Sequence, residues 1–469
     1  MEVGLRVTIA PHGGQNLREL LLGAGVRLPS DCGGAGTCGK CRAQVLDVGG
    51  WSSVLACQYA PALPVSVKVA RDVPVVRGRG VRRTGNSASL RLAVDIGTTT
   101  ISLAAVDVER RRIAARREEL NPQIVFGADV MSRIAAGAKL SRTPLTPVLH
   151  RFIDDAGIPR ERPIIAVGNT AMAHFLMGKS AATLGEFPYE PELTLRESLT
   201  SQRDGRWTRM LPLLGSFVGS DCAAAILAAG MHRTRRLSLL VDAGTNGEVV
   251  LGSRERMLVT STAAGPAFEG ATLECGSLAQ AGAVKAARFS RGRFKLDVIG
   301  GGEPKSICGS GVLDAVAEAV RVGKVDPSGR IAGHDRLELK QGHKPIYLTQ
   351  ADLREMQLAK GAIAAAIRVL LAEWGAAASD IERVHVTGKF GAAMNPGAAV
   401  RIGLLPRTPL DRIRQHGNLA LLGAVRATLD TSLFTEAERF AAKCREVVLS
   451  SHPQFEQIFV ESMGLESWN

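Results

Sequence analysis

The pattern of hydrophobic and polar positions along the first 70 residues predicts a small folded domain. Residues 3–10 alternate between apolar and polar side chains, as a half-buried strand does, and residues 17–25 carry a helical pattern that ends in glycine. Residues 41–48 and 65–70 follow as predicted strands. This order of strand, helix, loop and strands predicts a small α+β domain of the β-grasp type.

A longer pattern occurs twice further along the chain. In residues 92–107 and again in 239–252, an apolar strand runs into Asp-x-Gly-Thr and a second apolar strand follows. The two aspartates, Asp95 and Asp242, lie 147 positions apart. Residues 384–395 add a third strand that enters a glycine turn. The repetition predicts a duplicated α/β fold.

These turns carry the residue types that bind nucleotide phosphates. Glycine and threonine offer backbone N–H groups and hydroxyls to phosphate oxygens. An aspartate at the end of a strand can hold hydrated Mg²⁺ or orient a water molecule. One such turn is weak evidence, because any strand followed by a glycine turn supplies it. Two in tandem favour a nucleotide site over the alternative, in which each glycine serves only a tight turn.

Four cysteines near the N-terminus have the spacing of an iron–sulfur site. Cys32, Cys38, Cys41 and Cys57 are spaced C-x5-C-x2-C-x15-C, and the loop 31–41 is rich in glycine. Glycines let the backbone approach the bridging sulfides without Cβ clashes. The spacing differs from the plant-type C-x4-C-x2-C…C pattern by one residue in the first gap. We therefore predict that these four residues hold a [2Fe–2S] cluster in a ferredoxin-like domain.

Two other interpretations of the cysteines stay open. Four cysteines can bind structural zinc, although zinc sites usually show two C-x2-C pairs and this chain has one. They can also be inert core thiols, but three cysteines within ten residues argue against this interpretation. The remaining cysteines are scattered among apolar or helical stretches and are interpreted as core or surface thiols: Cys222, Cys275, Cys308 and Cys444.

The composition narrows the range of functions. The chain has 469 residues, enough for two to four domains, and a net charge of +13. Its basic residues are not interleaved with aromatic ones, so we expect no nucleic-acid binding. No run of about 18 uncharged apolar residues predicts a membrane span, and the start shows no signal-peptide pattern. We expect a cytoplasmic protein whose eight cysteines form no disulfide framework.

The changes in pattern predict the domain boundaries. Residues 1–73 form the ferredoxin-like domain, and the basic, Gly- and Ser-containing stretch 74–90 is a flexible linker. Residues 91–235 form the first nucleotide-binding subdomain. Residues 236–469 form the second, with a helical tail at the C-terminus.

The three turns resemble those of the superfamily that includes acetate kinase, sugar kinases, Hsp70 and actin, which has a duplicated ribonuclease-H-like ATPase fold. In that superfamily they are the phosphate-1, phosphate-2 and adenosine loops. Segments 121–134, 168–174, 264–270 and 307–316 narrow the match. Together with the cysteines, they make the chain similar to the reductive activators of corrinoid proteins over nearly its whole length.

The resemblance implies an activity. Members of this family are ATP-hydrolysing reductases that transfer one electron from a [2Fe–2S] cluster to a corrinoid protein of a methyltransferase system, returning inactive Co(II) to Co(I). Plant-type clusters have reduction potentials of about −400 mV. The Co(II)/Co(I) couple is expected to have a lower potential, so the electron transfer is uphill and needs ATP. The implied cofactors are the cluster, ATP and Mg²⁺. The implied partners are the corrinoid protein and an electron-donating reductase or ferredoxin, and a homodimer is a candidate assembly.

The resemblance also assigns residues to roles. The residues implied to be catalytic are Asp95 and Asp242, one in each phosphate loop, and Glu248 and Asn169, which position water or metal. The residues implied to bind the nucleotide are Gly97, Thr98, Thr99, Thr100, Gly244, Thr245, Asn246, Gly247, Gly388, Phe390 and Gly391.

The chain departs from its relatives at two points. Lys389 stands in the adenosine loop where a glycine is expected, which bears on nucleotide affinity. The chain also leaves little room between the linker and the first phosphate loop, where longer relatives carry an extra middle domain. Three alternative functions remain. One is a small-molecule kinase with a redox-sensing cluster, and another is an ATP-gated electron carrier or assembly factor. The third, an activator of a radical dehydratase, is disfavoured by the N-terminal cysteine block.

Overall fold

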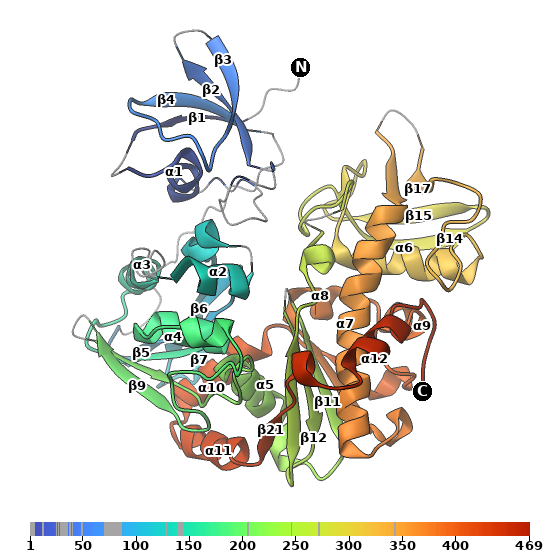
Figure 1. Cartoon of the computed structure of the whole chain (residues 1–469). Helices are drawn as coiled ribbons and strands as arrows, with labels where there is room; N and C mark the ends of the chain where they lie inside the picture. Colours follow the sequence, from blue (N-terminus) through green and yellow to red (C-terminus); the bar gives the residue numbers. More distant parts are fainter. Residues whose placement is uncertain are drawn as a thin grey trace. The chain divides into compact units, whose positions relative to one another are not determined.

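The computed structural model describes residues 5–11, 14–24, 26, 28, 36, 39, 41–47, 50–69, 87–127, 129–137, 145–203, 206–244, 246–270, 273–341 and 344–469. The chain divides into two compact units, and each is described by itself (Figure 1). The first contains residues 1–221 and 424–434. The second contains residues 222–423 and 435–469.

The N-terminal part of the first unit is a four-stranded sheet with one helix. The strand order is β1-β4-β2-β3, and all three pairings are antiparallel. In β4, Val65, Val67 and Val69 are buried and the residues between them are not, as the two-residue period of a strand requires. Leu17 and Leu21 of the helix are buried in the same core. The elements are β1 (Leu5–Ile9), α1 (Leu17–Gly23), β2 (Arg42–Asp47), β3 (Gly50–Leu55) and β4 (Val65–Val69).

The rest of the first unit is built on a six-stranded sheet of order β7-β6-β5-β8-β10-β9. The central strands β5 and β8 are parallel and almost wholly buried, which explains their continuous apolar runs. The strands are β5 (Leu90–Ile96), β6 (Thr100–Asp107), β7 (Arg112–Leu120), β8 (Ile164–Gly168), β9 (Leu199–Arg203) and β10 (Arg206–Met210). The helices are η1 (Ser87–Ser89), η2 (Pro122–Phe126), α2 (Val130–Ala136), α3 (Thr146–Ala156), α4 (Thr170–Met177) and η4 (Ala182–Gly185).

The second unit repeats this topology. Its sheet has the order β20-β19-β11-β12-β13-β21, and β11, β12, β13, β19 and β20 pair in the same directions as β5, β6, β7, β8 and β10. The predicted duplication of an α/β fold is therefore confirmed. The strands are β11 (Ser238–Ala243), β12 (Gly247–Gly252), β13 (Met257–Thr262), β19 (Arg383–Thr387), β20 (Ile413–Gln415) and β21 (Cys444–Glu446).

The long helix α7 (Gln350–Trp374) packs against β12 and β13 of this sheet (Figure 1). Thr349 and Asp352 form a reciprocal capping box at its start, and Gly375, in the left-handed region, ends it. The buried Lys360 ammonium of α7 donates to the carbonyls of Ser462 and Gly464, which holds the C-terminal segment on the helix.

Smaller elements complete the second unit. The strands are β14 (Ala283–Ser290), β15 (Arg293–Val298), β16 (Ser306–Ile307), β17 (Arg336–Lys340) and β18 (Ile346–Thr349). The helices are η5 (Met231–Arg233), η6 (Pro266–Glu269), α6 (Gly309–Arg321), η7 (Ala378–Asp380), α8 (Gly388–Ala393), α9 (Pro396–Arg401), η8 (Leu410–Arg412), η9 (Leu449–Ser451) and α12 (Phe455–Glu461). Three helices have residues in both units: α5 (Ser220–Ala229), α10 (Leu419–Leu429) and α11 (Ser432–Ala441).

The stretch predicted as a linker lies partly outside the described residues. Within it, 74–86 are not described, whereas Ser87–Ser89 form η1 and Leu90 begins β5. Ser89 is buried and donates to Asp107 at 2.9 Å, which fixes the start of the sheet.

Candidate nucleotide and iron–sulfur sites

The first Asp-x-Gly-Thr turn joins β5 to β6. Asp95 lies near the end of β5 with 9% of its surface exposed, and the Gly97 N–H donates to the Thr100 carbonyl at 3.0 Å. A Cβ at Gly97 would lie 2.7 Å from that carbonyl oxygen, so the turn requires glycine here. Thr98 and Thr99 occupy the tip of the turn. The sequence therefore predicts the position of this loop correctly.

Two asparagines hold the first turn in place. Asn169, predicted to position water or metal, donates from Nδ2 to Thr98 Oγ1 at 3.1 Å, while its Oδ1 accepts from Met172 N as the N-cap of α4. Asn121 is fully buried and donates from Nδ2 to the Gly97 carbonyl at 2.9 Å. Asn121 is not among the predicted site residues. The sequence does mark Asn121, because an asparagine followed by proline is typical of the start of a helix, here η2.

The second turn joins β11 to β12 in the second unit. The Gly244 N–H donates to the Asn246 carbonyl at 3.2 Å, and Asp242 lies opposite Glu248 in the strand register. Glu248 also accepts from Ser261 Oγ at 3.4 Å. A Cβ at Gly247 would lie 2.9 Å from the Ile363 side chain, so α7 packs directly on this turn. Thr245, predicted to bind phosphate, lies outside the described residues.

The third predicted loop lies against the second. Gly388 has φ +85°, and a Cβ there would lie 2.5 Å from the Asp242 carboxylate. A Cβ at Gly391 would lie 2.7 Å from Val386 Cγ1. The glycine turn expected from the sequence is in fact the start of the short helix α8, and the exposed Lys389 is in its first turn.

An aromatic pair supports α8. The ring of Phe390 stacks on that of Phe268 from η6, with centroids 4.3 Å apart and an interplanar angle of 13°. Both residues are buried, so Phe390 supports the loop from within the core. A Cβ at Gly309 would lie 1.9 Å from the Phe268 carbonyl oxygen, which brings the start of α6 against η6. Phe268 is not predicted as a site residue, because nothing local marks which ring stacks on Phe390.

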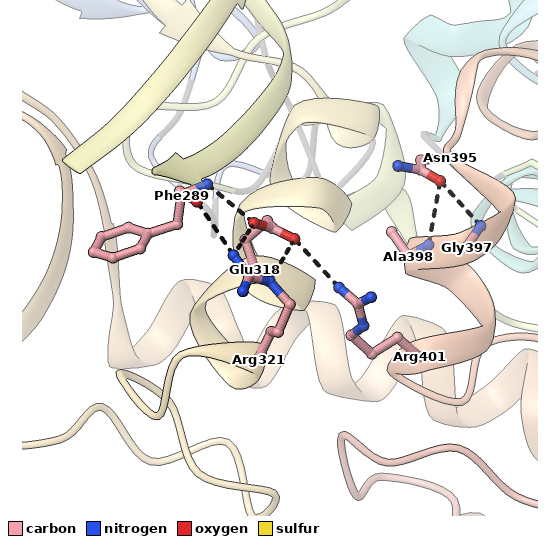
Figure 2. A network of polar contacts seen from close by, with 7 residues as sticks. All are labelled: Phe289, Glu318, Arg321, Asn395, Gly397, Ala398 and Arg401. Atoms are coloured by element: carbon pink, nitrogen blue, oxygen red, sulfur yellow. Dashed lines mark hydrogen bonds and ion pairs between the residues drawn. The ribbon is translucent and has the colours of Figure 1, made fainter. Parts of the chain in front are cut away.

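A polar network fixes α6 relative to α9, the helix that follows α8 (Figure 2). Glu318 of α6 accepts from Arg321 at 3.1 Å, from Arg401 of α9 at 3.2 Å and from the Phe289 N–H at 3.0 Å. The Arg321 hydrogen bond is the main cause that lowers the pKa of Glu318. Asn395 caps α9 through Gly397 N and Ala398 N, as Figure 2 shows.

Two of the four predicted cluster ligands meet in the N-terminal domain. Cys41 and Cys57 are buried, and their Sγ atoms are 3.2 Å apart, close enough to bind one metal ion. Gly36, with φ +81°, packs so closely on Gln58 that a Cβ would lie 1.9 Å from its amide. Two convergent thiols, with Gly36 packed on the residue that follows Cys57, fit a [2Fe–2S] cluster.

Cys32 and Cys38 lie outside the described residues. Within the described part of the chain, no group of three or more His, Cys, Asp or Glu side chains could hold a metal ion. Cys222, Cys308 and Cys444 are buried and Cys275 is partly buried, as predicted for core or surface thiols. Among the described residues, no helix is long and apolar enough to cross a membrane.

Three family profiles cover most of the chain. Residues 1–62 match the 2Fe-2S iron-sulfur cluster binding domain, residues 90–234 match the RACo middle region, and residues 236–469 match the C-terminal domain of RACo, the ASKHA domain. The first profile includes all four predicted cluster cysteines, and the last includes the second and third loops.

Two curated relatives and one solved structure are similar to the chain. The corrinoid activation enzyme RamQ of Eubacterium limosum is 31% identical over 376 residues, which are 71% of this chain and 63% of RamQ. The [Co(II) methylated amine-specific corrinoid protein] reductase of Methanosarcina barkeri is 29% identical over 254 residues, which are 50% of this chain and 46% of that protein. The chain thus spans less than two thirds of each curated relative. A solved reductive activator for a corrinoid, iron–sulfur protein superposes with a TM-score of 0.71 at 25% identity, over 97% of this chain and 96% of that one.

The fold and the domains define a protein that combines an iron–sulfur domain with an ATP-binding domain of the ASKHA class. The chain belongs to the RACo family.

Proposed function

We propose that this chain carries out the ATP-dependent reductive activation of a corrinoid protein, in which inactive Co(II) is reduced to Co(I) for a methyltransferase. The observation that carries the proposal is one chain with both an iron–sulfur domain and duplicated phosphate turns. The names of the two relatives and of the solved structure point to the same class of reaction.

The N-terminal domain holds the redox centre in this proposal. The cluster is bound by Cys32, Cys38, Cys41 and Cys57. The Sγ atoms of Cys41 and Cys57 are 3.2 Å apart, which supports these two residues as ligands. A [2Fe–2S] cluster supplies one-electron chemistry at low potential. An electron-donating reductase or ferredoxin supplies the electron.

The ATPase domain supplies the driving force. The first turn binds phosphate through Gly97, Thr98, Thr99 and Thr100, and the second through Gly244, Thr245, Asn246 and Gly247. Asp95 and Asp242 are each the next-to-last residue of the strand that enters the turn, where a carboxylate can hold hydrated Mg²⁺. Asn169 and Glu248 orient water or metal at the same turns. ATP then promotes the uphill reduction by favouring complexes with one cobalt state over the other.

The test combines the anaerobically reduced protein with a Co(II) corrinoid protein encoded beside its gene. Visible spectra should show Co(I) only when MgATP is added, because the reduction is uphill. Cys41→Ala removes a cluster ligand and Asp95→Ala removes a phosphate-loop carboxylate, so each should abolish the Co(I) band. Cys444→Ala, which changes a buried cysteine outside the cluster set, is the matched control and should keep activity.

The other functions predict different results. Phosphorylation of a small molecule without Co(I) would identify a kinase, and ATP-independent tight binding of the partner without reduction would identify a carrier. If the cluster is reduced and the partner binds, the absence of Co(I) both with and without ATP contradicts the proposal for that partner.

A further inference from the structure

The start of helix α1 is bonded to the segment that carries two predicted cluster ligands. Leu17 N donates to the Tyr59 carbonyl at 2.7 Å, and Arg18 N donates to the Ala56 carbonyl at 3.1 Å. These two acceptors flank Cys57. Ala56 N in turn donates to the Cys41 carbonyl at 2.9 Å. Leu17, Cys41 and Cys57 are also buried in the same core, so α1 and the two cysteines are joined by both packing and hydrogen bonds.

The side chain of Arg18 leaves this group and reaches the nucleotide-binding part of the same unit. Its Nη2 donates to the Ile124 carbonyl of η2 at 3.0 Å. Arg18 is 6% exposed and Ile124 is 3% exposed, and α1 packs on η2. A charged donor on a buried carbonyl is one of the stronger protein hydrogen bonds, and leaving either group unpaired is costly.

Helix η2 is attached in turn to the first phosphate turn. The N-cap of η2 is Asn121, whose backbone carbonyl accepts a hydrogen bond from Ile124 N at 3.1 Å. The Asn121 backbone N–H donates to the Thr99 carbonyl at 3.0 Å, and its side chain donates to the Gly97 carbonyl at 2.9 Å. Asn121 therefore joins the first phosphate turn directly to η2.

We propose that Arg18 is a positioning residue that couples nucleotide binding at the first phosphate turn to the position of the cluster domain. This inference rests on the proposed function, because it assumes that the turn binds ATP. The connection runs from Gly97 and Thr99 through Asn121 and Ile124 to Arg18, and from there to the cysteine segment. The coupling is reciprocal: if nucleotide binding strengthens or weakens the Arg18 contact, the contact strengthens or weakens nucleotide binding by the same factor.

Hydrogen exchange of the full chain tests the coupling, with AMPPNP and Mg²⁺ as the probe. In the wild type, nucleotide should change amide exchange at residues 96–100 and also at 17–23, the latter by about fivefold or more, the lower end of couplings between protein sites. In Arg18→Ala the change at 96–100 should remain and the change at 17–23 should disappear. Arg18→Lys keeps the charge and should restore part of the response.

Arg42→Ala is the matched control, because it removes an exposed positive charge next to Cys41 in the same domain. It should respond to nucleotide as the wild type does, and visible circular dichroism of the cluster confirms that each variant is folded. The proposal is overturned if Arg18→Ala keeps the response at 17–23, or if the wild type responds at 96–100 only. Failure of calorimetry to detect AMPPNP binding would instead overturn the nucleotide site, and the coupling with it.

Discussion

At the scale of single residues, Gly388 brings the third predicted loop against the second. Its φ of +85° is in the left-handed region, and its Cα is so close to Asp242 that a Cβ would lie 2.5 Å from the carboxylate oxygen. Both the backbone conformation and the space therefore require glycine at this position. The carboxylate that we assign to Mg²⁺ or water is held against this glycine.

Gly388→Ala should therefore weaken nucleotide binding. The left-handed backbone lowers the stability of the variant by about 1–2 kcal/mol. The effect on affinity comes from the new Cβ, which would lie 2.5 Å from the Asp242 carboxylate and displace it; we expect a loss of roughly tenfold, about 1.4 kcal/mol of binding free energy. Titration calorimetry with MgATP measures the effect. The control is Gly375→Ala, which has φ +77° and open space around the site of the new Cβ. It should lose about 1 kcal/mol of stability with unchanged affinity; equal affinities for both variants would contradict the role of Gly388.

Local sequence predicts the residues of the turns but not those that support them. Asp95, Gly97, Asp242 and Gly244 are recognisable because each turn repeats a short pattern. Phe268 and Asn121 are not, because their partners lie far away in the chain: Phe268 stacks on Phe390, and Asn121 contacts Gly97. Such contacts depend on how the elements pack, which no single segment encodes.

At the scale of elements, a buried histidine on the strand that precedes the third loop contacts a half-buried histidine that follows β20. His385 of β19 and His416 are 3.0 Å apart between Nδ1 and Nε2, with stacked rings. Burial, and then the charges of His416, Arg383 and Arg414, lower the pKa of His385 to about 4. Burial and Arg414 lower the pKa of His416 as well. Both imidazoles are therefore neutral in the folded protein at pH 7.

This pair should make the protein less stable in mild acid. An unfolded histidine has a pKa of about 6.5, so between pH 6.5 and about 4 the unfolded state binds more protons than the folded state. The free energy of unfolding therefore falls as the pH is lowered through this window. For His385 alone the total is about 3 kcal/mol.

Urea unfolding at pH 7 and pH 5 measures this dependence. The free energy of unfolding should fall less between pH 7 and pH 5 in His385→Asn than in the wild type, whatever the stability of the variant at pH 7. His334→Asn, which changes an exposed histidine, should keep the wild-type fall. An unchanged fall in His385→Asn would show that other groups cause it.

The sequence predicts the elements better than their boundaries. The two strand–turn–strand repeats are confirmed, because continuous apolar runs are typical of buried strands. The third loop is a helix instead of a turn: two glycines in the segment 388–391 weigh against a helix by propensity, but packing of Phe390 and Gly391 stabilises it. Tertiary contacts thus override a local preference.

At the scale of the whole molecule, the account depends on two chemistries carried by one chain. The iron–sulfur domain matches residues 1–62 and the ASKHA domain residues 236–469. Neither match alone indicates the activity, because iron–sulfur domains and this ATPase fold both serve many functions. Their combination in one chain supports the proposed ATP-driven one-electron reduction. The contact of Arg18 with Ile124 is the connection that we infer between the iron–sulfur domain and the first phosphate turn, which lies in the middle region 90–234.

In the proposed function, ATP hydrolysis drives an electron from the cluster of this chain to Co(II). The most direct measurement is freeze-quench EPR of the reduced protein mixed with its Co(II) corrinoid partner, which counts the spins of both centres. The account predicts that the cluster signal and the Co(II) signal disappear in equal amounts after MgATP is added, and that both persist with AMPPNP. Equal loss without nucleotide, or hydrolysis of ATP with both signals intact, would contradict it.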